Sequence, residues 1–489
     1  MEVQINIDKL KDAVDQVNYN PLADDLTLAV LNSIPFEEYN ECDTTALQKQ
    51  KLSTLKMLSI PPKYTTVRVN TLKINLKVAE ETVGDYIKKN YNDKTSRIPM
   101  LYTHPILSDL LVIKSSQKLD VIPASKEVIV RKVCGAAVMR GAHVYGQGVL
   151  SVNPNIVVGE KVAVYADIHE KCLRGSKFFQ GIKIFLGNGI AKQSRKDLFH
   201  KNTSAGLAFE MVEQIHKSPS LGDLHPDFLF LQNLPSVVCS HVLCPPPHSV
   251  VLDMCAAPGG KTTHIATLMK NTGLVIAIDR SQARINQIET RARSLDLSNI
   301  KTFCYDSSKI ILISRNQTID SQLKTKKMSL EECTNKNVHQ ISPPFLPLSF
   351  DYILLDAPCS GLGQRPQLAT KMSLKCLKSF PVMQRKLFEN AVQLLRVGGK
   401  LVYSTCTIVA EENEMMVKWA LQKYKEIKLI DSQPKLGLQG LLGCGLSKED
   451  CAKLQRFGPM FQGQQNTQNS CSGENLDTIG FFIAPFTKV

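Results

Sequence analysis

Two cysteines follow short apolar runs that predict buried strands. Asp356-Ala357-Pro358-Cys359 comes after residues 352–355, and Ser404-Thr405-Cys406 comes after residues 400–403. Each motif places a thiol at the carboxyl end of a strand, where doubly wound folds carry out their chemistry. Isolated cysteines are usually buried structural residues, which is our expectation for most of the other twelve. A thiol beside an acid at that edge suits nucleophilic catalysis, so Cys359, Cys406 and Asp356 are candidate catalytic residues.

A glycine-rich turn between a predicted strand (residues 250–252) and a predicted helix from about Lys261 suits a bound nucleoside. Free N–H groups at the helix start and glycines that permit close approach favour a ligand there. The next strand ends in Asp279, at the distance of an acid that binds ribose hydroxyls, and Asp306 follows a further strand, where it suits an adenine amino group. The turn consists of Cys255, Ala256, Ala257, Pro258, Gly259, Gly260 and Lys261.

The identity of that nucleoside follows by exclusion. GxGxxG is absent, which disfavours a dinucleotide. A P-loop would need glycine where Cys255 stands. S-adenosylmethionine fits the three positions best, and the alternative is a tight turn that binds no ligand.

These groups together suit methylation of a cytosine at carbon 5, which is a poor nucleophile. A thiolate that adds to carbon 6 makes carbon 5 enamine-like, so that it attacks a sulfonium methyl group. Asp356 is placed to interact with ring N3, and Lys261 to orient the base or the acid. After a basic group removes the proton on carbon 5, the thiol leaves, and the second cysteine assists that release.

The elements around these motifs predict an α/β protein in several parts. Residues 1–60 have helical periodicity around Leu22, Leu26, Val30 and Leu31, and residues 65–71 read as a strand. Short strands separated by glycines, at 128–130, 136–138, 148–150, 161–165 and 183–186, predict a small β-barrel. From about residue 249 strands and helices alternate, which predicts a Rossmann-like doubly wound core.

Composition limits the class of protein. The 489 residues include 43% hydrophobic and 21% charged residues, and the net charge of +14 favours a polyanionic partner such as nucleic acid. No cysteine pair has CxxC spacing, so we expect no metal. We find no signal peptide and no membrane span, and expect a cytoplasmic protein with reduced thiols and a monomeric state.

The two cysteine motifs and the cofactor turn resemble the Sun-domain family of RNA cytosine-5 methyltransferases. Residues 68–71, 232–236 and 480–483 carry further resemblance, which therefore spans most of the chain. In that family the Thr-Cys thiol is the nucleophile and the Pro-Cys thiol promotes release, which implies these roles for Cys406 and Cys359. The family's S-adenosylmethionine site implies residues 255–261, Asp279, Arg284, Asp306 and Asp356.

The predicted barrel resembles a PUA domain, an RNA-binding module, on the basis of residues 139–145, 158–164 and 185–189. Family members with this arrangement methylate an acceptor-stem cytosine of particular tRNAs, recognise the CCA end, and act on some mRNA sites. This implies an N-terminal α+β region (1–120), an inserted PUA domain (121–215) and a methyltransferase domain (216–489, with its catalytic core from about 237). Candidate RNA contacts are Arg140, Tyr145, Arg174, Arg195 and Asn233, and a solvated surface charge is the alternative for each arginine.

Two other functions remain open from the sequence. In DNA cytosine-5 enzymes a Pro-Cys thiol attacks, but the intact Thr-Cys motif argues against that assignment here. A catalytically silent RNA-binding protein would use the barrel alone, and the complete catalytic motifs argue against it. Residues 309–348 are longer than the family pattern and, with residues 455–476, are predicted to be loops.

Overall fold

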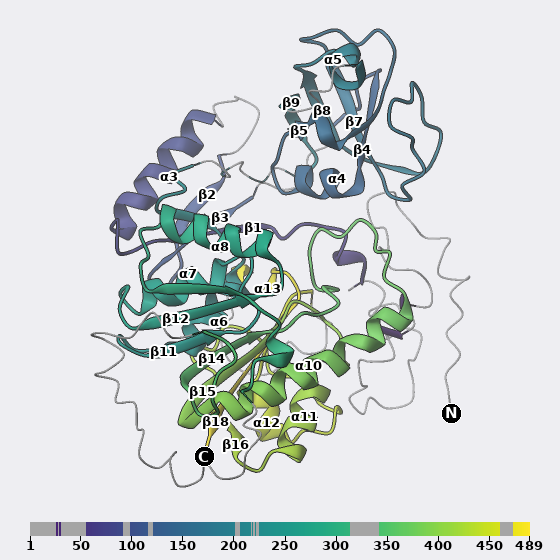
Figure 1. Cartoon of the computed structure of the whole chain (residues 1–489). Coiled ribbons are helices and arrows are strands. Elements are labelled where there is room, and N and C mark those ends of the chain that lie inside the picture. Colours follow the sequence, from purple (N-terminus) through teal and green to yellow (C-terminus); the bar gives the residue numbers. More distant parts are fainter. Residues whose placement is uncertain are drawn as a thin grey trace.

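The computed structural model of the chain describes residues 26–27, 29–30, 55–90, 98–115, 121–200, 206–216, 218, 221, 224–312, 342–459 and 473–489. They form an N-terminal sheet region, a β-domain within residues 121–216, and a C-terminal core within residues 234–489 (Figure 1). The β-domain stands at one end of the molecule, with helix α4 on its side nearest the rest of the chain.

The C-terminal core is built on an eight-stranded sheet in the order β13-β12-β11-β14-β15-β18-β16, with β17 beside β18. Its strands are β11 (Val250–Asp253), β12 (Leu274–Asp279), β13 (Ile300–Cys304), β14 (Phe350–Asp356), β15 (Leu395–Thr405), β16 (Ile427–Leu429), β17 (Gln455–Phe457) and β18 (Phe481–Lys488). The pairs formed among β11 to β15 are parallel, and β18 pairs antiparallel with β15. Because the chain order reverses between β12-β11 and β14-β15, the carboxyl ends of β11 and β14 flank the switch point where such sheets bind ligands.

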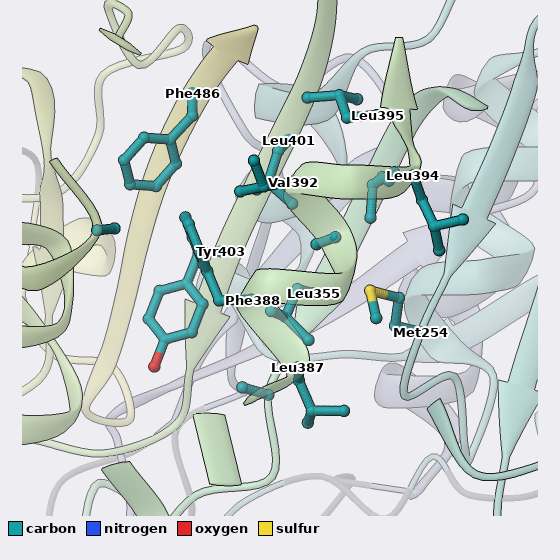
Figure 2. Packing of buried hydrophobic residues seen from close by; sticks show 14 of the residues in the cluster. Met254, Leu355, Leu387, Phe388, Val392, Leu394, Leu395, Leu401, Tyr403 and Phe486 are labelled. Atoms are coloured by element: carbon teal, nitrogen blue, oxygen red, sulfur yellow. The ribbon is translucent and has the colours of Figure 1, made fainter. Parts of the chain in front are cut away.

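Helices cover both faces of this sheet. They are α6 (Leu234–Leu243), α7 (Gly260–Leu268), α8 (Gln282–Ser294), α10 (Leu374–Leu394), α11 (Glu414–Lys423), α12 (Lys448–Lys453) and α13 (Gly473–Leu476), with 3-10 turns at Ser307–Lys309 and Ala410–Glu412. The central strands β11, β12 and β14 and the second half of β15 are near-continuous apolar runs because both of their faces are buried. Figure 2 shows Phe388 and Val392 of α10 beside Leu401 and Tyr403 of β15, with Phe486 of β18 nearby. This packing fixes the strand ends that carry the chemistry.

The N-terminal region forms an antiparallel sheet in the order β10-β1-β3-β2, with helix α3 packed on it. Its elements are β1 (Tyr64–Val69), α3 (Leu76–Asn90), β2 (Met100–Thr103), β3 (Leu110–Lys114) and β10 (Leu229–Leu231). Ala79, Val83 and Ile87 recur at helical spacing on the buried face of α3. Strand β10 follows the β-domain in sequence, so the β-domain is inserted between β3 and β10.

The β-domain has a six-stranded sheet in the order β5-β9-β8-β7-β4-β6. Its elements are β4 (Glu127–Arg131), α4 (Lys132–Met139), β5 (Val144–Tyr145), a 3-10 turn (Gly146–Gly148), β6 (Val149–Val152), β7 (Lys161–Asp167), β8 (Lys183–Ala191), α5 (Arg195–His200) and β9 (Leu207–Gln214). The predicted strand at 136–138 is wrong, because these residues lie in α4. A short apolar run does not distinguish strand from helix, and Gly135 lets this helix lie against Ala166 of β7.

The other strands predicted from the sequence are confirmed within a few residues, as are the alternation of strands and helices and the helix that begins at the cofactor turn. Leu26 and Val30, from the predicted N-terminal helical region, are helical and fully buried. Leu22, Leu31 and most of the predicted loop at 309–348 lie outside the described residues. The loop predicted at 455–476 is wrong at its two ends, because Gln455–Phe457 form β17, which pairs with β18, and Gly473–Leu476 form α13. Residues 460–472 of that stretch lie outside the described residues. Among the helices that the structure describes, none is long and apolar enough to cross a membrane.

Candidate active site

The cofactor turn connects β11 to α7 at the switch point of the sheet. Gly259 has φ 95°, and a Cβ at this position would lie 3.3 Å from atoms of Ile288 in α8. Both facts require glycine. The turn opens onto a cleft of about 610 Å³ that residues 255–258, Gly260, Lys261 and Asp356 help to line.

The strand ends supply acceptors for a nucleoside. Asp279, at the end of β12, accepts from the Ser281 amide at 3.0 Å and lies 3.6 Å from the Arg284 guanidinium. Burial tends to raise the pKa of Asp306, but hydrogen bonds from Ser308 outweigh it, so the pKa is lowered and the group is an anion at neutral pH. Neither aspartate lines the 610 Å³ cleft, so they extend the site beyond it.

These residues fit S-adenosylmethionine. Asp279 and Asp306 are acceptors for hydroxyl and amino hydrogens, and the turn admits a closely packed ligand. Asp253 at the end of β11 is 1% exposed, and its Oδ1 has no hydrogen-bond partner among the described residues, although Thr262 donates to Oδ2 at 2.7 Å. Asp253 also lines the cleft, and burial raises the pKa of its carboxyl group to about 7.

The two candidate catalytic cysteines lie side by side. The Sγ atoms of Cys359 and Cys406 are 3.3 Å apart, and the Cys406 amide lies 3.4 Å from the Cys359 sulfur. The hydrogen bond to Cys406, burial and the charge of Glu412 raise the pKa of Cys359 well above its usual value. The hydrogen bond from Cys359 lowers the pKa of Cys406. The pair therefore favours a Cys406 thiolate that accepts a hydrogen bond from the Cys359 thiol.

Lys261 and Asp356 form an ion pair next to these thiols. Lys261 Nζ donates to Asp356 Oδ2 at 2.7 Å, and Ser404 Oγ donates to Oδ1 at 2.7 Å. Burial opposes the positive charge, but the Asp356 carboxylate raises the pKa of Lys261 above its usual value. The Lys261 ammonium also lies 5.0 Å from the centre of the Phe481 ring. The carboxylate is thus held by two donors at the end of β14.

A buried network that the sequence did not reveal holds the cysteine loops. Glu412 is fully buried, and its Oε2 accepts from the Ser360 amide and from Gln384 Nε2, each at 2.9 Å. Gln384 also donates to the carbonyl of Pro358 at 3.0 Å, and the hydroxyls of Ser360 and Thr407 lie 2.8 Å apart. Glu412 follows Cys406 by six positions, but only the fold brings Gln384 from α10 to it.

Two of the motifs that carried the family resemblance meet at a buried guanidinium. Arg68 Nε donates to Gln232 Oε1 at 2.8 Å, and its Nη2 donates to Thr263 Oγ1 of α7 at 3.0 Å. Burial lowers the pKa of Arg68 to about 10, so it remains a cation at neutral pH. These contacts fix the N-terminal sheet against the helix of the cofactor turn.

The candidate RNA contacts fall into two groups. Arg140 and Asn233 line the same cleft as Lys261, and Tyr145 is 52% exposed on the β-domain. Arg174 donates to the carbonyls of Gly146, Val149 and Leu198, and Arg195 to those of Val152, Gly175 and Ser176. These two guanidiniums therefore stabilise loops of the β-domain. A role for any of the five residues in RNA binding stays a prediction.

One further cluster has metal-ligand chemistry: Asp109, His241 and His264 lie together between the N-terminal sheet and helices α6 and α7. The Nε2 atoms of His241 and His264 lie 2.9 and 2.7 Å from the two carboxylate oxygens of Asp109. These lengths are those of direct hydrogen bonds. The cluster therefore joins the N-terminal region to the core through hydrogen bonds.

The family described as 16S rRNA methyltransferase RsmB/F matches residues 240–439. The tRNA (cytosine(72)-C(5))-methyltransferases NSUN6 of Mus musculus and Homo sapiens are each 43% identical to this chain. The alignments cover 90% of this chain and 90% of the mouse protein, and 91% of this chain and 93% of the human one. The chain belongs to the RNA (cytosine-C5)-methyltransferase family.

An archaeal relative and a solved archaeal structure support the same family assignment. The tRNA (cytosine(72)-C(5))-methyltransferase of Pyrococcus horikoshii is 32% identical over 89% of this chain and 92% of the relative. The crystal structure of NSun6 from Pyrococcus horikoshii with SFG superposes with a TM-score of 0.70 at 29% identity and covers 96% of this chain and 99% of the other. As a member of this family, the chain is an S-adenosylmethionine-dependent RNA cytosine-C5 methyltransferase, and the silent RNA-binding alternative is not favoured.

Proposed function

We propose that this enzyme methylates a cytosine near the 3′ acceptor end of tRNA, and some mRNA sites in addition. The observation that carries the chemistry is the 3.3 Å approach of the Cys359 and Cys406 sulfurs beside the Lys261–Asp356 pair. The names of the mammalian and archaeal relatives, which specify cytosine 72 of tRNA, support the choice of substrate.

Each of the site residues has a separate role in the reaction. The bound S-adenosylmethionine supplies the electrophilic methyl group. As the Cys406 thiolate adds to C6 of the cytosine, N3 takes up a proton from solvent, and the Asp356 carboxylate accepts a hydrogen bond from that N3–H. After methylation a basic group takes the proton from C5, the C6–S bond breaks so that Cys406 leaves as a thiolate, and N3 returns its proton to solvent. The Cys359 S–H, hydrogen-bonded to that sulfur, stabilises the departing charge.

The domain roles belong to the same proposal. Residues 1–120 form an N-terminal α+β region, residues 121–215 a PUA domain for RNA, and residues 216–489 the methyltransferase domain. Arg140 and Asn233 support this assignment because they bring the β-domain and the start of α6 to the catalytic cleft. The acceptor stem and CCA end would bind across this junction.

Three further features complete the proposal. The target base must leave its stack to reach a thiol at the end of a strand, so an opened acceptor end is the preferred substrate. Catalysis needs a reduced thiol pair, which fits the cytoplasm. A monomeric state belongs to the same proposal.

Methyl transfer to purified tRNA, with the modified position located by bisulfite sequencing, tests this proposal. The expected product is 5-methylcytosine at the acceptor end, with a weaker signal on selected mRNA fragments. Modification elsewhere in tRNA, or in rRNA alone, would contradict the proposed substrate. A protein that binds tRNA but neither binds S-adenosylmethionine nor methylates RNA would favour the silent RNA-binding alternative. A tRNA cross-linked at its terminal pairs should be a poor substrate, and full activity on it would exclude base opening.

A further inference from the structure

The segment that begins at Cys359 packs one of its side chains into the β-domain. Residues 357–373 have no regular secondary structure and lead from the end of β14 to the start of α10. Leu368, nine positions after Cys359, is 3% exposed and belongs to the hydrophobic cluster of the β-domain rather than to that of the core. A side chain from the catalytic loop is thus a core residue of the neighbouring domain.

The β-domain has a socket for this side chain. A Cβ added to Gly135 of α4 would lie 3.1 Å from Leu368 Cδ1, and also 2.6 Å from the Cβ of Ala166 and 3.4 Å from Leu186 Cδ1. Glycine at position 135 therefore leaves room for Leu368 between α4 and the strands β7 and β8. Helix α4 lies on the side of the β-domain that faces the core (Figure 1).

An ion pair reinforces the same junction. Glu170, in the loop after β7, pairs with Lys371 of the catalytic segment and lies 3.5 Å from Lys132 at the start of α4. The pair is partly exposed, so it adds orientation more than stability.

The rest of the segment is held rigidly against the core. The Gly363 amide donates to the carbonyl of Cys406 at 3.0 Å, and the Gln367 amide donates to the carbonyl of Leu58 at 2.7 Å. Arg365 is 3% exposed and donates to Asp477 at 2.6 Å and to the Thr478 carbonyl at 2.8 Å. Because these hydrogen bonds fix the segment on the Cys359 side of Leu368, Leu368 is a fixed point against which the β-domain packs.

We propose that Leu368 is a positioning residue that fixes the β-domain relative to the catalytic thiols, so that RNA held by the β-domain presents one cytosine to Cys406. This inference rests on the proposed role of the β-domain in binding RNA. It assigns the choice of cytosine partly to a hydrophobic anchor that contacts neither the RNA nor the cofactor.

The test compares Leu368→Ala with Leu198→Ala. Leu198 of α5 is fully buried in the same hydrophobic cluster, so both variants delete the same atoms from it, but only Leu368 comes from the catalytic segment. We measure the kcat and KM for tRNA, the affinity for tRNA, and the distribution of methyl groups over neighbouring cytosines. Values of kcat are normalised to the fraction of protein that binds S-adenosylmethionine.

We expect kcat of Leu368→Ala to fall by about 10- to 100-fold, with tRNA affinity within about twofold of wild type and methylation spread to neighbouring cytosines. Leu198→Ala should lower the thermal midpoint similarly and keep both kcat and site choice. Equal effects of the two variants on kcat and site choice would overturn the proposal. Leu368→Met, which nearly conserves volume, should restore most of the activity.

Two additional measurements keep the test decisive. If Leu368→Ala does not fold, Glu170→Gln weakens the same junction at a partly exposed site, and it should broaden site choice with about a two- to fivefold loss of kcat. An unchanged site distribution in that variant would then refute the proposal. Amide hydrogen exchange of residues 360–371 should increase in Leu368→Ala and not in Leu198→Ala. A wild-type enzyme that methylates no tRNA would instead refute the proposed substrate, whatever the exchange shows.

Discussion

Replacing Lys261 by methionine removes the positive charge beside Asp356 and keeps a side chain of similar length. The ammonium is 13% exposed and lies 2.7 Å from a carboxylate that is 30% exposed and keeps one other donor, Ser404. Breaking a buried pair costs about 3–5 kcal/mol, and partial exposure of Asp356 reduces this to roughly 2 kcal/mol of folding stability. Lys261 orients the Asp356 carboxylate that faces N3 of the adduct, and the loss of this charged hydrogen bond, at about 1.5–3 kcal/mol, corresponds to roughly a 10- to 100-fold fall in kcat.

The same substitution should also raise the pKa of Cys406, the proposed nucleophile. The positive charge of Lys261 lowers the pKa of Cys406 and the negative charge of Asp356 raises it, so the thiolate becomes less stable when only Lys261 is lost. The rate of Cys406 alkylation by iodoacetamide, followed by peptide mass spectrometry from pH 5 to pH 10, should therefore rise at a higher pH in Lys261→Met than in wild type. Lys261→Arg, which keeps the charge, is the control. An alkylation profile that does not move, or that moves to lower pH, would refute this electrostatic role.

Three other perturbations test separate parts of the site. Gly259→Ala, which forces a Cβ into a turn with φ 95° near Ile288, should weaken S-adenosylmethionine binding about tenfold in calorimetry, and unchanged affinity would contradict the assigned turn. Burial raises the pKa of Glu412 above its ordinary value of 4.5. Ionisation of Glu412 in the folded protein therefore lowers the free energy of unfolding as the pH rises above that value. Glu412→Gln should gain stability relative to wild type in urea unfolding as the pH rises above 4.5, and a difference that shrinks with pH would show the opposite sign. Arg140→Ala should reduce the salt dependence of tRNA binding by about one counterion, whereas Arg174→Ala should mainly lower the thermal midpoint, and the reverse pattern would exclude the division between cleft and structural arginines.

The elements of the core were predictable because their periodicity is local. Both faces of the parallel strands are buried, so residues 250–252 and 274–278 are apolar runs bounded by turn residues. Cys359, Cys406, Asp279 and Asp356 each sit at or just after the end of such a run. Doubly wound folds carry their chemistry at the carboxyl ends of strands, so the positions of these residues could be predicted from the sequence.

The parts that the sequence did not reveal depend on long-range packing. Ala136 and Ala137 suit a strand or a helix equally well, and the close packing of α4 on β7, where a Cβ at Gly135 would lie 2.6 Å from the Cβ of Ala166, cannot be read from the local pattern. Strand β10 pairs with β1 across the whole inserted β-domain, a separation that no local pattern reports.

The hydrogen-bond partners of individual side chains could not be predicted from the sequence either. Gln384 occupies an ordinary position in an amphipathic helix, and its bond to Glu412 exists only because α10 crosses the cysteine loops. Arg174 and Arg195 look like free surface charges in the sequence. The fold directs both guanidiniums to carbonyl groups of the β-domain's own loops.

The assignment of Cys406 as nucleophile and Cys359 as the group that promotes release has a direct measurement. Wild type, Cys359→Ala and Cys406→Ala are each incubated with tRNA and S-adenosylmethionine and then run on a denaturing gel, where a covalent protein–RNA adduct migrates slowly. Because Cys359 stabilises the departing thiolate, Cys359→Ala should accumulate the adduct, while Cys406→Ala should form none. An adduct trapped by Cys406→Ala instead would make Cys359 the nucleophile and contradict the account.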